Sequence, residues 1–280
     1  MKSGPGWKLD PEKCIRCGLC IGDCPVQVLT RDENGYPVMP RDLIFSCIRC
    51  QHCFAICPGG AISMSHADPV SAAPISELPD PAKVAGVLRN RRSIRRYKPE
   101  PLTAEDMAQV KELLRYFPTG CNDHRLVFRI VEDPAEMAGF RKVTLNLLSL
   151  LVKSKLLHIF YPGIRRFLEE IRNGVDVIYR DAPHMIVAAS PKNAPCKKAD
   201  PWIALSYLDV YLQSKGIGSC WCGFALYAFL FSGKLRKMLA LPAGYKAEAV
   251  LLFGYPAVHY ARAAEPEQVQ IITGKNGNES

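Results

Sequence analysis

The feature that most constrains this chain is a pair of four-cysteine runs near its amino terminus. Each run has the spacing Cys-x2-Cys-x2-Cys-x3-Cys-Pro, and the second run repeats the first after 33 residues. The runs occupy residues 14–25 and 47–58, and both begin with the tetrapeptide Cys-Ile-Arg-Cys. A module this small cannot fold on its apolar residues alone, so whatever the cysteines bind must form part of its core.

This spacing is typical of bacterial ferredoxins with two [4Fe–4S] clusters. Three cysteines in a tight loop can turn their thiolates onto three irons of one cubane, while the fourth points away to the other cluster. Pro25 and Pro58 fix the backbone just after each fourth cysteine. The expected ligands of the first cluster are Cys14, Cys17, Cys20 and Cys57. The expected ligands of the second cluster are Cys47, Cys50, Cys53 and Cys24.

Two other interpretations of these cysteines are a structural zinc site and a disulfide framework. Zinc motifs usually present paired Cys-x2-Cys knuckles, whereas here four cysteines fall within eleven residues, and do so twice. Disulfides would require a secreted protein, and residues 1–6 contain no apolar signal core. The iron–sulfur interpretation is therefore preferred. Free thiolates that await iron indicate a reducing, anaerobic, cytoplasmic setting.

The positive charge of the chain bears on its partners. A net charge of +9 at first suggests nucleic acid or another anionic surface. Each four-thiolate cluster carries about −2, which offsets part of that charge. The excess lies in residues 67–280, which hold 29 Lys and Arg against 21 Asp and Glu. No basic run there is interleaved with aromatic residues, so we expect a phosphate-bearing cofactor and no nucleic acid.

The chain is long enough for one or two domains, with 280 residues of which 48% are hydrophobic. Its longest apolar stretch, Val143 to Tyr161, falls short of a membrane span because polar residues interrupt it. Residues 67–81 are rich in proline and predict a linker. The expected organisation is a 2[4Fe–4S] ferredoxin domain at 1–66, the linker at 67–81, a second domain at 82–262 and a tail at 263–280.

Local signals predict an α+β fold for the second domain. Asp80 followed by Pro81 predicts a helix start. Thr103, with Asp106 three residues later, predicts another. Longer helices are expected from Met137 to about Ile171, with a break at Pro162-Gly163, and from Asp200 to about Lys215. Strands are expected at 127–131, 184–189 and 249–253. Helices outnumber strands and follow them irregularly, which favours the α+β class.

An arginine cluster marks the start of this domain. Arg91, Arg92, Arg95 and Arg96 flank Ser93 at a predicted helix end. Guanidinium groups bind phosphate through two parallel hydrogen bonds, and the serine hydroxyl can add a neutral donor. A solvated basic face, or a docking surface for an acidic ferredoxin, would explain the same residues. No Gly-x-Gly-x-x-Gly fingerprint or P-loop is present, so a phosphate here is not held in the Rossmann manner.

Five segments, all in family order, resemble the nitroreductase superfamily of FMN enzymes. They are Arg-Arg-Ser-Ile-Arg at 91–95, Pro-Thr-Gly-Cys-Asn at 118–122, Ala-Pro-His-Met-Ile-Val at 182–187, Gly-Ile-Gly-Ser-Cys-Trp-Cys-Gly-Phe at 216–224, and Gly-Tyr-Pro at 254–256. The resemblance covers about 82–262. It implies an α+β homodimer with a central, mostly antiparallel sheet flanked by helices and with FMN at the subunit interface.

The same resemblance implies roles for individual residues. The FMN phosphate and the pyrimidine edge of the ring would be held by Arg91, Arg92, Ser93 and Arg95. The loop that lines the isoalloxazine from the neighbouring subunit would be Pro118, Thr119, Gly120 and Asn122. The backbone at Cys222 and Gly223 would bond flavin N5. Arg262 resembles a late basic residue that returns to the phosphate, and His259 is a weaker candidate for that task.

The chain departs from the family at two places. The family commonly continues Asn-x-Gln-Pro, but this chain has Asn122-Asp123-His124-Arg125, which puts the substrate and nicotinamide contacts in doubt. His124 is a weak candidate proton donor, since its ordinary pKa suits neutral pH, or else simply an exposed loop residue. The Leu-rich segment 140–172 lies where the family has a variable cover, so it is either an apolar lid or core helix.

Four cysteines lie outside the two runs: Cys121, Cys196, Cys220 and Cys222. Cys220 and Cys222 could form a redox-active thiol site beside N5, but buried cysteine more often packs as a small hydrophobe. A third metal site from Cys196, Cys220 and Cys222 is disfavoured because no fourth ligand is evident. Tyr97 and Tyr207 are interpreted as packing residues.

These observations predict an iron–sulfur flavoprotein oxidoreductase. An external low-potential donor such as ferredoxin would reduce two [4Fe–4S] clusters, and electrons would pass through FMN to an organic acceptor such as a nitro compound or quinone. One alternative is an NAD(P)H-dependent nitroreductase whose clusters are an electron outlet. The other is an electron-transfer subunit of a larger complex without a substrate of its own.

Overall fold

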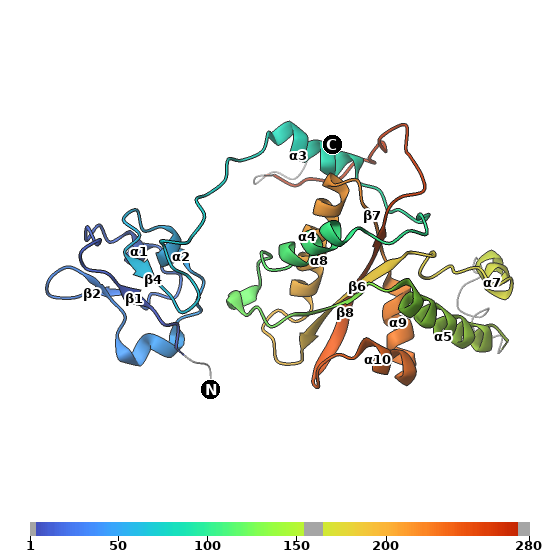
Figure 1. Cartoon of the computed structure of the whole chain (residues 1–280), viewed down its shortest axis with the longest axis horizontal. Helices are drawn as coiled ribbons and strands as arrows, with labels where there is room; N and C mark the ends of the chain where they lie inside the picture. Colours follow the sequence, from blue (N-terminus) through green and yellow to red (C-terminus); the bar gives the residue numbers. More distant parts are fainter. Residues whose placement is uncertain (1–3, 154–164, 274–280) are drawn as a thin grey trace. The chain divides into compact units, whose positions relative to one another are not determined.

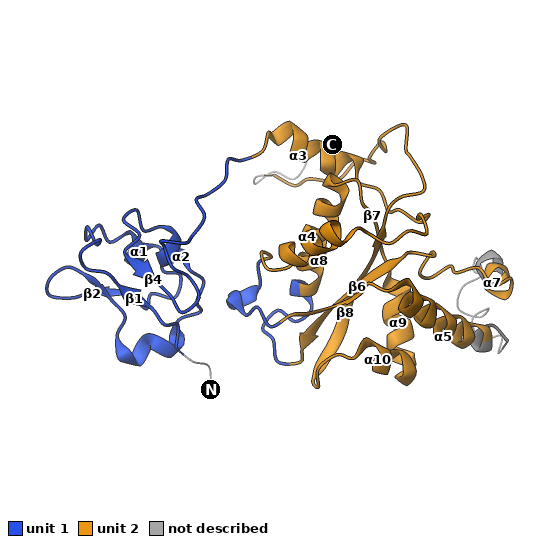
Figure 2. Cartoon of the chain, in the orientation of Figure 1, with its two compact units in different colours: residues 1–78, 118–125, 193–200 blue, residues 79–117, 126–192, 201–280 orange. Residues whose placement is uncertain are grey.

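A computed structural model describes residues 4–153 and 165–273, and it divides the chain into two units (Figures 1 and 2). The first unit contains residues 1–78 with the segments 118–125 and 193–200. The second contains residues 79–117, 126–192 and 201–280. The first division falls after Leu78, inside the expected linker.

The first unit consists of very short elements. Its strands are β1 (Lys8–Leu9), which pairs antiparallel with β4 (Ile62–Ser63), and β2 (Thr30–Arg31), which pairs with β3 (Pro37–Val38). Its helices are α1 (Leu19–Gly22), α2 (His52–Ala55) and the 3-10 turns η1 (Arg41–Ser46) and η2 (Gly120–Asn122). Its fully buried core is small and is centred on Cys20, Leu29 and Ile62. A core this small cannot stabilise the fold alone, so the stability of this module depends on what its cysteines bind.

The sequence repeat in this unit is also a structural repeat. Arg16 and Arg49, the third residues of the two Cys-Ile-Arg-Cys runs, both have φ of 57°. The residues that directly precede α1 and α2, Gly18 and Gln51, are also left-handed, with φ of 79° and 64°. Left-handed backbone is costly for residues with a Cβ, so its recurrence at matching positions indicates two loops built to the same plan.

The second unit is built on one antiparallel sheet with the strand order β5-β6-β8-β7. The strands are β5 (Val127–Val131), β6 (His184–Pro191), β8 (Tyr245–Gly254) and β7 (Gly218–Trp221). The prediction for 127–131 is confirmed, while the two central strands are longer than predicted. β7 was missed because its glycine-rich surroundings predicted a loop. Pairing with β8, for example Trp221 with Leu251, makes it a strand.

Helices cover both faces of the sheet. The helices of this unit are α3 (Pro81–Asn90), α4 (Ala104–Leu113), α5 (Pro134–Lys153), α7 (Arg165–Arg172), α8 (Ala199–Ser214), α9 (Gly223–Phe231) and α10 (Gly233–Leu239). Side chains alternate along β6: Met185 and Val187 pack with α5, α9 and α10, whereas Ile186 and Ala188 pack with α4 and α8 (Figure 1). All eight positions of β6 are therefore buried. The α+β prediction is confirmed.

The helix predictions were correct in type but not always in extent. Thr103 caps α4 as predicted, since its hydroxyl accepts from the Asp106 N–H at 3.1 Å. α5 begins at Pro134 rather than Met137 because the Asp133 carboxylate accepts from the Ala135 N–H at 2.8 Å. α9 and α10 were not predicted. Phe140 is fully buried, so the segment 140–172 contributes to the core where it begins. The predicted break at 162–163 lies outside the described residues.

Within the described ranges, no helix combines the length and the apolar character that crossing a membrane would need.

Candidate functional site

The eight motif cysteines of the first unit line two separate pockets. One pocket is lined by Cys14, Cys17, Cys20 and Cys57, together with residues such as Ile15 and Pro58. The other is lined by Cys24, Cys47, Cys50 and Cys53, together with residues such as Ile48 and Val26. In each pocket, three cysteines of one run meet the last cysteine of the other. The structure therefore brings together the same two groups of four that the spacing predicts for two clusters.

The chemistry of these pockets suits iron–sulfur clusters. Burial is the main cause that raises the pKa values of Cys20, Cys47 and Cys53, the last to about 11. A buried thiol with a raised pKa does not ionise without a cation, so binding of iron supplies the charge that the thiolate needs. The Cys47 and Cys57 sulfurs already accept backbone N–H groups, from Arg49 at 3.4 Å and from Ala61 at 3.3 Å.

Across residues 4–153 and 165–273, no three or more His, Cys, Asp or Glu side chains converge closely enough to hold one metal ion. Neither the eight motif cysteines nor the set Cys196, Cys220 and Cys222 forms such a group among the described residues. A cubane has four irons and keeps its thiolates apart, so it suits four cysteines spread around a pocket better than a single zinc ion does.

The loop 118–125 belongs to the first unit and contacts the second cysteine run. The Asn122 side-chain amide donates to the carbonyl oxygens of Ile48 at 3.0 Å and Arg49 at 3.1 Å, both between Cys47 and Cys50. The Asn122 side-chain oxygen lies 2.8 Å from Nε2 of His124. Asn122 and His124 are left-handed, with φ of 51° and 45°. Asn122 therefore engages the ferredoxin module, and its predicted contact with flavin stays a prediction.

Buried groups hold this loop in place. The Gly120 N–H donates to the buried Asp200 carboxylate at 3.0 Å. A Cβ at Gly120 would lie 2.3 Å from the Cys196 sulfur, so only glycine fits there. Arg125 lies in the segment 122–125, where the chain departs from the family pattern. It pairs with Asp123 at 2.7 Å and donates to the Asn193 side chain at 3.0 Å. Those two residues therefore have a structural role in this chain.

In the second unit, a buried carboxylate orients the arginine cluster. The Arg91 Nε lies 3.2 Å from the Asp209 carboxylate, which also accepts a hydrogen bond from the Ser219 hydroxyl. The Ile94 N–H donates to the Ser219 carbonyl at 2.8 Å, which joins the segment 91–94 to β7. A Cβ at Gly218 would lie 2.7 Å from Ile94, so glycine permits this approach. Among the residues that the structure describes, only Nε of Arg91 has an ion-pair partner, so its terminal nitrogens can bind an anion.

Further guanidinium groups surround β7. Burial raises the pKa of Cys220, and the positive charges of Arg95, Arg180 and Arg91 oppose that rise. Arg92 lies over the Tyr260 ring, 5.7 Å from its centroid. Such a concentration of guanidinium groups around one strand suits a phosphate or an anionic ring.

A cavity of about 460 Å³ lies beside this cluster. His259 and Arg262, the two late basic candidates, both line it, as do Ile94 from the arginine segment and Gly218 from β7. Its volume is in the range usual for small-molecule pockets. The structure thus brings the predicted phosphate residues from both ends of the domain to one region.

The Cys222–Gly223 backbone opens α9. Among the described residues, the Gly223 N–H has no hydrogen-bond acceptor. A free N–H at the first turn of a helix is a ready donor for an electron-rich atom such as flavin N5. Burial raises the pKa of Cys222 to about 12, and its sulfur donates to the Ile178 carbonyl at 3.3 Å. Cys222 therefore behaves as a buried, neutral thiol.

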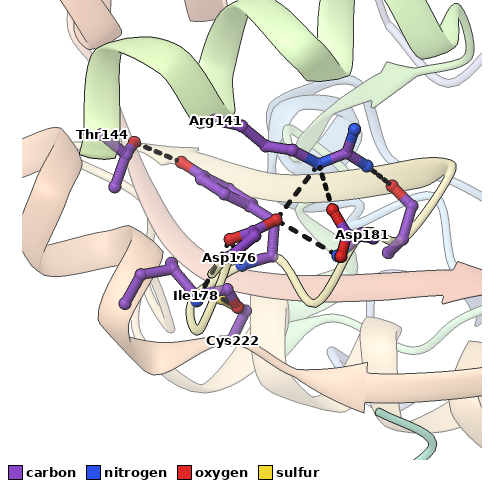
Figure 3. A network of polar contacts seen from close by, with 8 residues as sticks. Arg141, Thr144, Asp176, Ile178, Asp181 and Cys222 are labelled. Carbon is purple, nitrogen blue, oxygen red and sulfur yellow. Dashed lines mark hydrogen bonds and ion pairs between the residues drawn. The ribbon is translucent and has the colours of Figure 1, made fainter. Parts of the chain in front are cut away.

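A polar network fixes the turn that follows Ile178 (Figure 3). Asp176 accepts from the N–H groups of Ile178 at 3.2 Å and Tyr179 at 2.8 Å. Arg141 lies 3.1 Å from the Asp176 carboxylate and also donates to the carbonyl of Ala182. Arg180 and Asp181 are left-handed, with φ of 55° and 53°. This network holds that strained turn in place beside Cys222.

Several of these residues were not identified from the sequence. Asp209, Arg180 and Tyr260 follow no local motif, because their partners lie far along the chain. Ser219 lies within the 216–224 segment, but its bond to Asp209 was not predicted. One signal was available for Asp209, a lone carboxylate in the apolar part of a long helix. Tyr97 packs against the core as predicted, whereas Tyr207 is 54% exposed and the packing interpretation is wrong for it.

Comparison with known proteins identifies the class to which this fold and site belong. A model described as the nitroreductase family matches residues 88–255, which is more than half of the chain. A model described as a 4Fe-4S dicluster domain matches residues 13–62. The chain belongs to the nitroreductase family, and it carries a 4Fe-4S dicluster domain ahead of the family's fold.

Individual relatives agree with this assignment. An iodotyrosine deiodinase from Thermotoga neapolitana is 27% identical over 173 residues, which cover 60% of this chain and 86% of that protein. An NADH dehydrogenase from Thermus thermophilus is 26% identical over 187 residues, covering 63% of this chain and 87% of that one. A solved nitroreductase with bound FMN from Desulfitobacterium hafniense shares the fold, with a TM-score of 0.56 and 21% identity over 70% of this chain and 100% of its own.

The predicted family is therefore confirmed. The chain is an oxidoreductase of the nitroreductase type with an added 4Fe-4S ferredoxin-like domain.

Proposed function

We propose that this protein passes electrons from a low-potential donor, a reduced ferredoxin, through two [4Fe–4S] clusters to FMN and on to an organic acceptor such as a nitro compound or quinone. The observation that carries this proposal is the pair of four-cysteine pockets in a chain of the nitroreductase family. A flavin enzyme that takes hydride from a nicotinamide needs no iron. Two one-electron sites in the same chain suit a one-electron donor.

Residues of the second unit support the binding of FMN. Arg91, held by Asp209, and the exposed Arg92 and Arg95 would neutralise the phosphate and the pyrimidine edge. Arg262 would add charge from the C-terminal segment. The unpaired Gly223 N–H would donate to flavin N5. When bound, FMN would collect single electrons and deliver them to the acceptor in pairs.

We propose further that the protein is a homodimer with FMN at the subunit interface. α9 presents a row of exposed aromatic side chains, with Phe224 and Tyr227 each 61% exposed and Phe231 76% exposed. Trp202 and Tyr207 of α8 are also about half exposed. An apolar surface of this extent is rare on a monomer and suits burial against a second copy. Light scattering of Tyr227→Glu should then report a monomer. Tyr116→Glu changes an exposed tyrosine in the turn after α4, and this control should remain dimeric.

One observation favours a second candidate function. The similar protein from Thermus thermophilus is an NADH dehydrogenase. By analogy, NAD(P)H could reduce the flavin directly, and the clusters would then be an outlet for electrons.

The test is an anaerobic titration of the full-length protein loaded with iron and FMN, with reduced ferredoxin, NADH and NADPH added separately. Flavin and cluster absorbance are followed together in the wild type and in Cys50→Ser, which should lose the second cluster. The proposal expects ferredoxin to bleach both centres in the wild type. It expects slow or no flavin bleaching by ferredoxin in Cys50→Ser.

Bleaching of the flavin by NAD(P)H ahead of the clusters would reject this direction of flow and favour the second candidate. Equal flavin bleaching by ferredoxin in both proteins would show that the clusters are not the inlet. An iron content too low for two clusters would reject the two-cluster assignment itself.

A further inference from the structure

Trp7 has a buried polar atom without a partner. Its indole Nε1 is inaccessible to solvent, and among the described residues it has no hydrogen-bond acceptor. Trp7 packs against the small core of the first unit together with Cys53 and Cys24. Its side chain lies beside the Cys53 sulfur. The N–H therefore approaches the sulfur without closing a hydrogen bond to it.

A buried N–H without an acceptor normally costs about 1–3 kcal/mol, so natural proteins keep few of them. Such a group points to an acceptor that is supplied by something bound. A thiolate or sulfide of an iron–sulfur cluster is a suitable acceptor, because it carries negative charge and lies where the Cys53 sulfur lies.

The backbone around Trp7 holds the indole in place. The residues after it form β1, which pairs with β4 through Lys8–Ser63 and Leu9–Ile62. Before it, the Pro5 carbonyl accepts from the Ser65 N–H at 3.2 Å and from the Ser65 hydroxyl at 3.1 Å. Trp7 is thus fixed on both sides, as a group that positions a hydrogen bond must be.

The other half of the module lacks this donor. Tyr36 directly precedes β3 as Trp7 directly precedes β1, but its hydroxyl accepts from Arg16 at 2.8 Å. The Arg16 guanidinium also lies over the Tyr36 ring, 4.3 Å from its centroid. Cys20 is the counterpart of Cys53 in the first run. No side chain in the described part of the chain is found to donate to Cys20.

We propose that Trp7 donates its indole N–H to the cluster held by Cys24, Cys47, Cys50 and Cys53, and that this bond raises the potential of that cluster above that of the other. Hydrogen bonds to cluster sulfurs stabilise the reduced, more negative state and so raise the reduction potential. This inference rests on the proposed two-cluster function. It adds a direction of electron flow within the module, because electrons would accumulate on the cluster with the higher potential, which Cys47, Cys50 and Cys53 hold.

The test compares Trp7→Phe with the wild type in a redox titration followed by electron paramagnetic resonance. Both full-length proteins carry iron and FMN. Phenylalanine keeps an aromatic ring and removes only the donor. At the potential where the wild-type second cluster is half reduced, its reduced-to-oxidised ratio should fall about tenfold, or 59 mV for one electron. The first cluster should shift far less. Tyr36→Phe is the matched control and should leave the second cluster unchanged.

A measurement without a core substitution guards against a misfolded variant. In wild-type protein labelled at the tryptophan indole nitrogen, the Trp7 signal should be shifted and broadened by the reduced cluster. Trp202 and Trp221 supply the reference signals.

An unshifted Trp7 signal would overturn the inference. It would also be overturned if each cluster had the same reduction potential in Trp7→Phe as in the wild type. Equal shifts of both clusters in the variant would overturn it too. If the wild type itself lacks two clusters by iron content, the proposed function fails instead, and the two failures are distinguished.

Discussion

At the scale of single residues, buried polar side chains decide how the second unit presents its arginines. The Asp209 side chain is 6% exposed and the Arg91 side chain 28% exposed. A pair this buried loses much of its hydration, so removing one member leaves the other charge poorly compensated. Asp209 also accepts from Ser219, which links the pair to β7.

Asp209→Asn should therefore lower the free energy of unfolding of the second unit by about 2 kcal/mol. Tryptophan fluorescence during anaerobic denaturation measures this change. Glu112→Gln breaks the Arg115–Glu112 pair, whose side chains are 72% and 53% exposed, and should cost less than about 0.5 kcal/mol. Equal losses in the two variants would contradict the role given to Asp209.

Cys222 gives the second unit a dependence on pH. Burial raises its pKa to about 12, against an ordinary value near 8.5 in an unfolded chain. Between these two values, the unfolded chain has released a proton that the folded chain retains. The free energy of unfolding should therefore be unaffected by this thiol below about pH 8 and fall above it, by up to about 1.4 kcal/mol per pH unit.

Cys222→Ala should remove that part of the alkaline slope, as seen in denaturation curves collected from pH 8 to 11. Cys121→Ala, at an exposed cysteine, should keep the wild-type slope. Parallel curves for Cys222→Ala and wild type would mean that Cys222 ionises in the folded protein.

At the scale of elements, the loop 118–125 shows how a short segment can be shaped by distant partners. Cys121, Asn122 and His124 are left-handed within four consecutive positions. Each such residue costs about 1 kcal/mol or more, so the conformation persists only where other contacts compensate. Here the compensation comes from Asp200 at Gly120 and from the Asn122 bonds to the second cysteine run.

Asn122→Ala removes both bonds to the Ile48 and Arg49 carbonyls and should loosen the Cys47–Cys50 loop. Amide hydrogen exchange there should accelerate about tenfold, corresponding to a loss of about 1.4 kcal/mol, with little change at Cys14–Cys17. Arg31 caps the Arg16 carbonyl of the first run at 3.1 Å. Arg31→Ala should have the reverse pattern, and acceleration of both loops in either variant would argue against local anchoring.

At the scale of the whole molecule, the two units depend on different sources of stability. The second unit has a large apolar core on both faces of its sheet. The first has a small apolar core, centred on Cys20, Leu29 and Ile62, and its motif cysteines line two pockets. Binding of iron should therefore supply much of the folding energy of the first unit and little of that of the second.

Removal of iron by a chelator under reducing conditions should unfold residues 13–62 while the second unit keeps its thermal transition and its bound FMN. Hydrogen exchange resolves the two regions, and restored iron and sulfide should restore protection. Persistent protection of 13–62 without iron would show that the module folds on its own contacts.

Much of this architecture could be predicted from local signals. The cysteine spacing predicts the same two groups of four that line the pockets, because a run of eleven residues has little freedom in how its thiols point. The Thr103 cap and the strand at 127–131 were also predicted correctly, because their signals lie within a few neighbouring residues. The five family segments led to the correct fold class and family. β7 and α9 were missed because their glycine-containing or almost uniformly apolar residues carry no clear period. α10 was missed because its seven residues, GKLRKML, span too few turns to show one.

The sequence by itself determined the ligand chemistry, the class of fold and the identity of the basic cluster, because each depends on residues close together in the chain. Only the tertiary structure decided which partners those residues have. Asp209 faces Arg91, Asn122 faces the Cys47–Cys50 loop, and Trp7 faces Cys53 across long stretches of sequence. These pairings arise from packing between elements, and their energy depends on burial that no local pattern encodes.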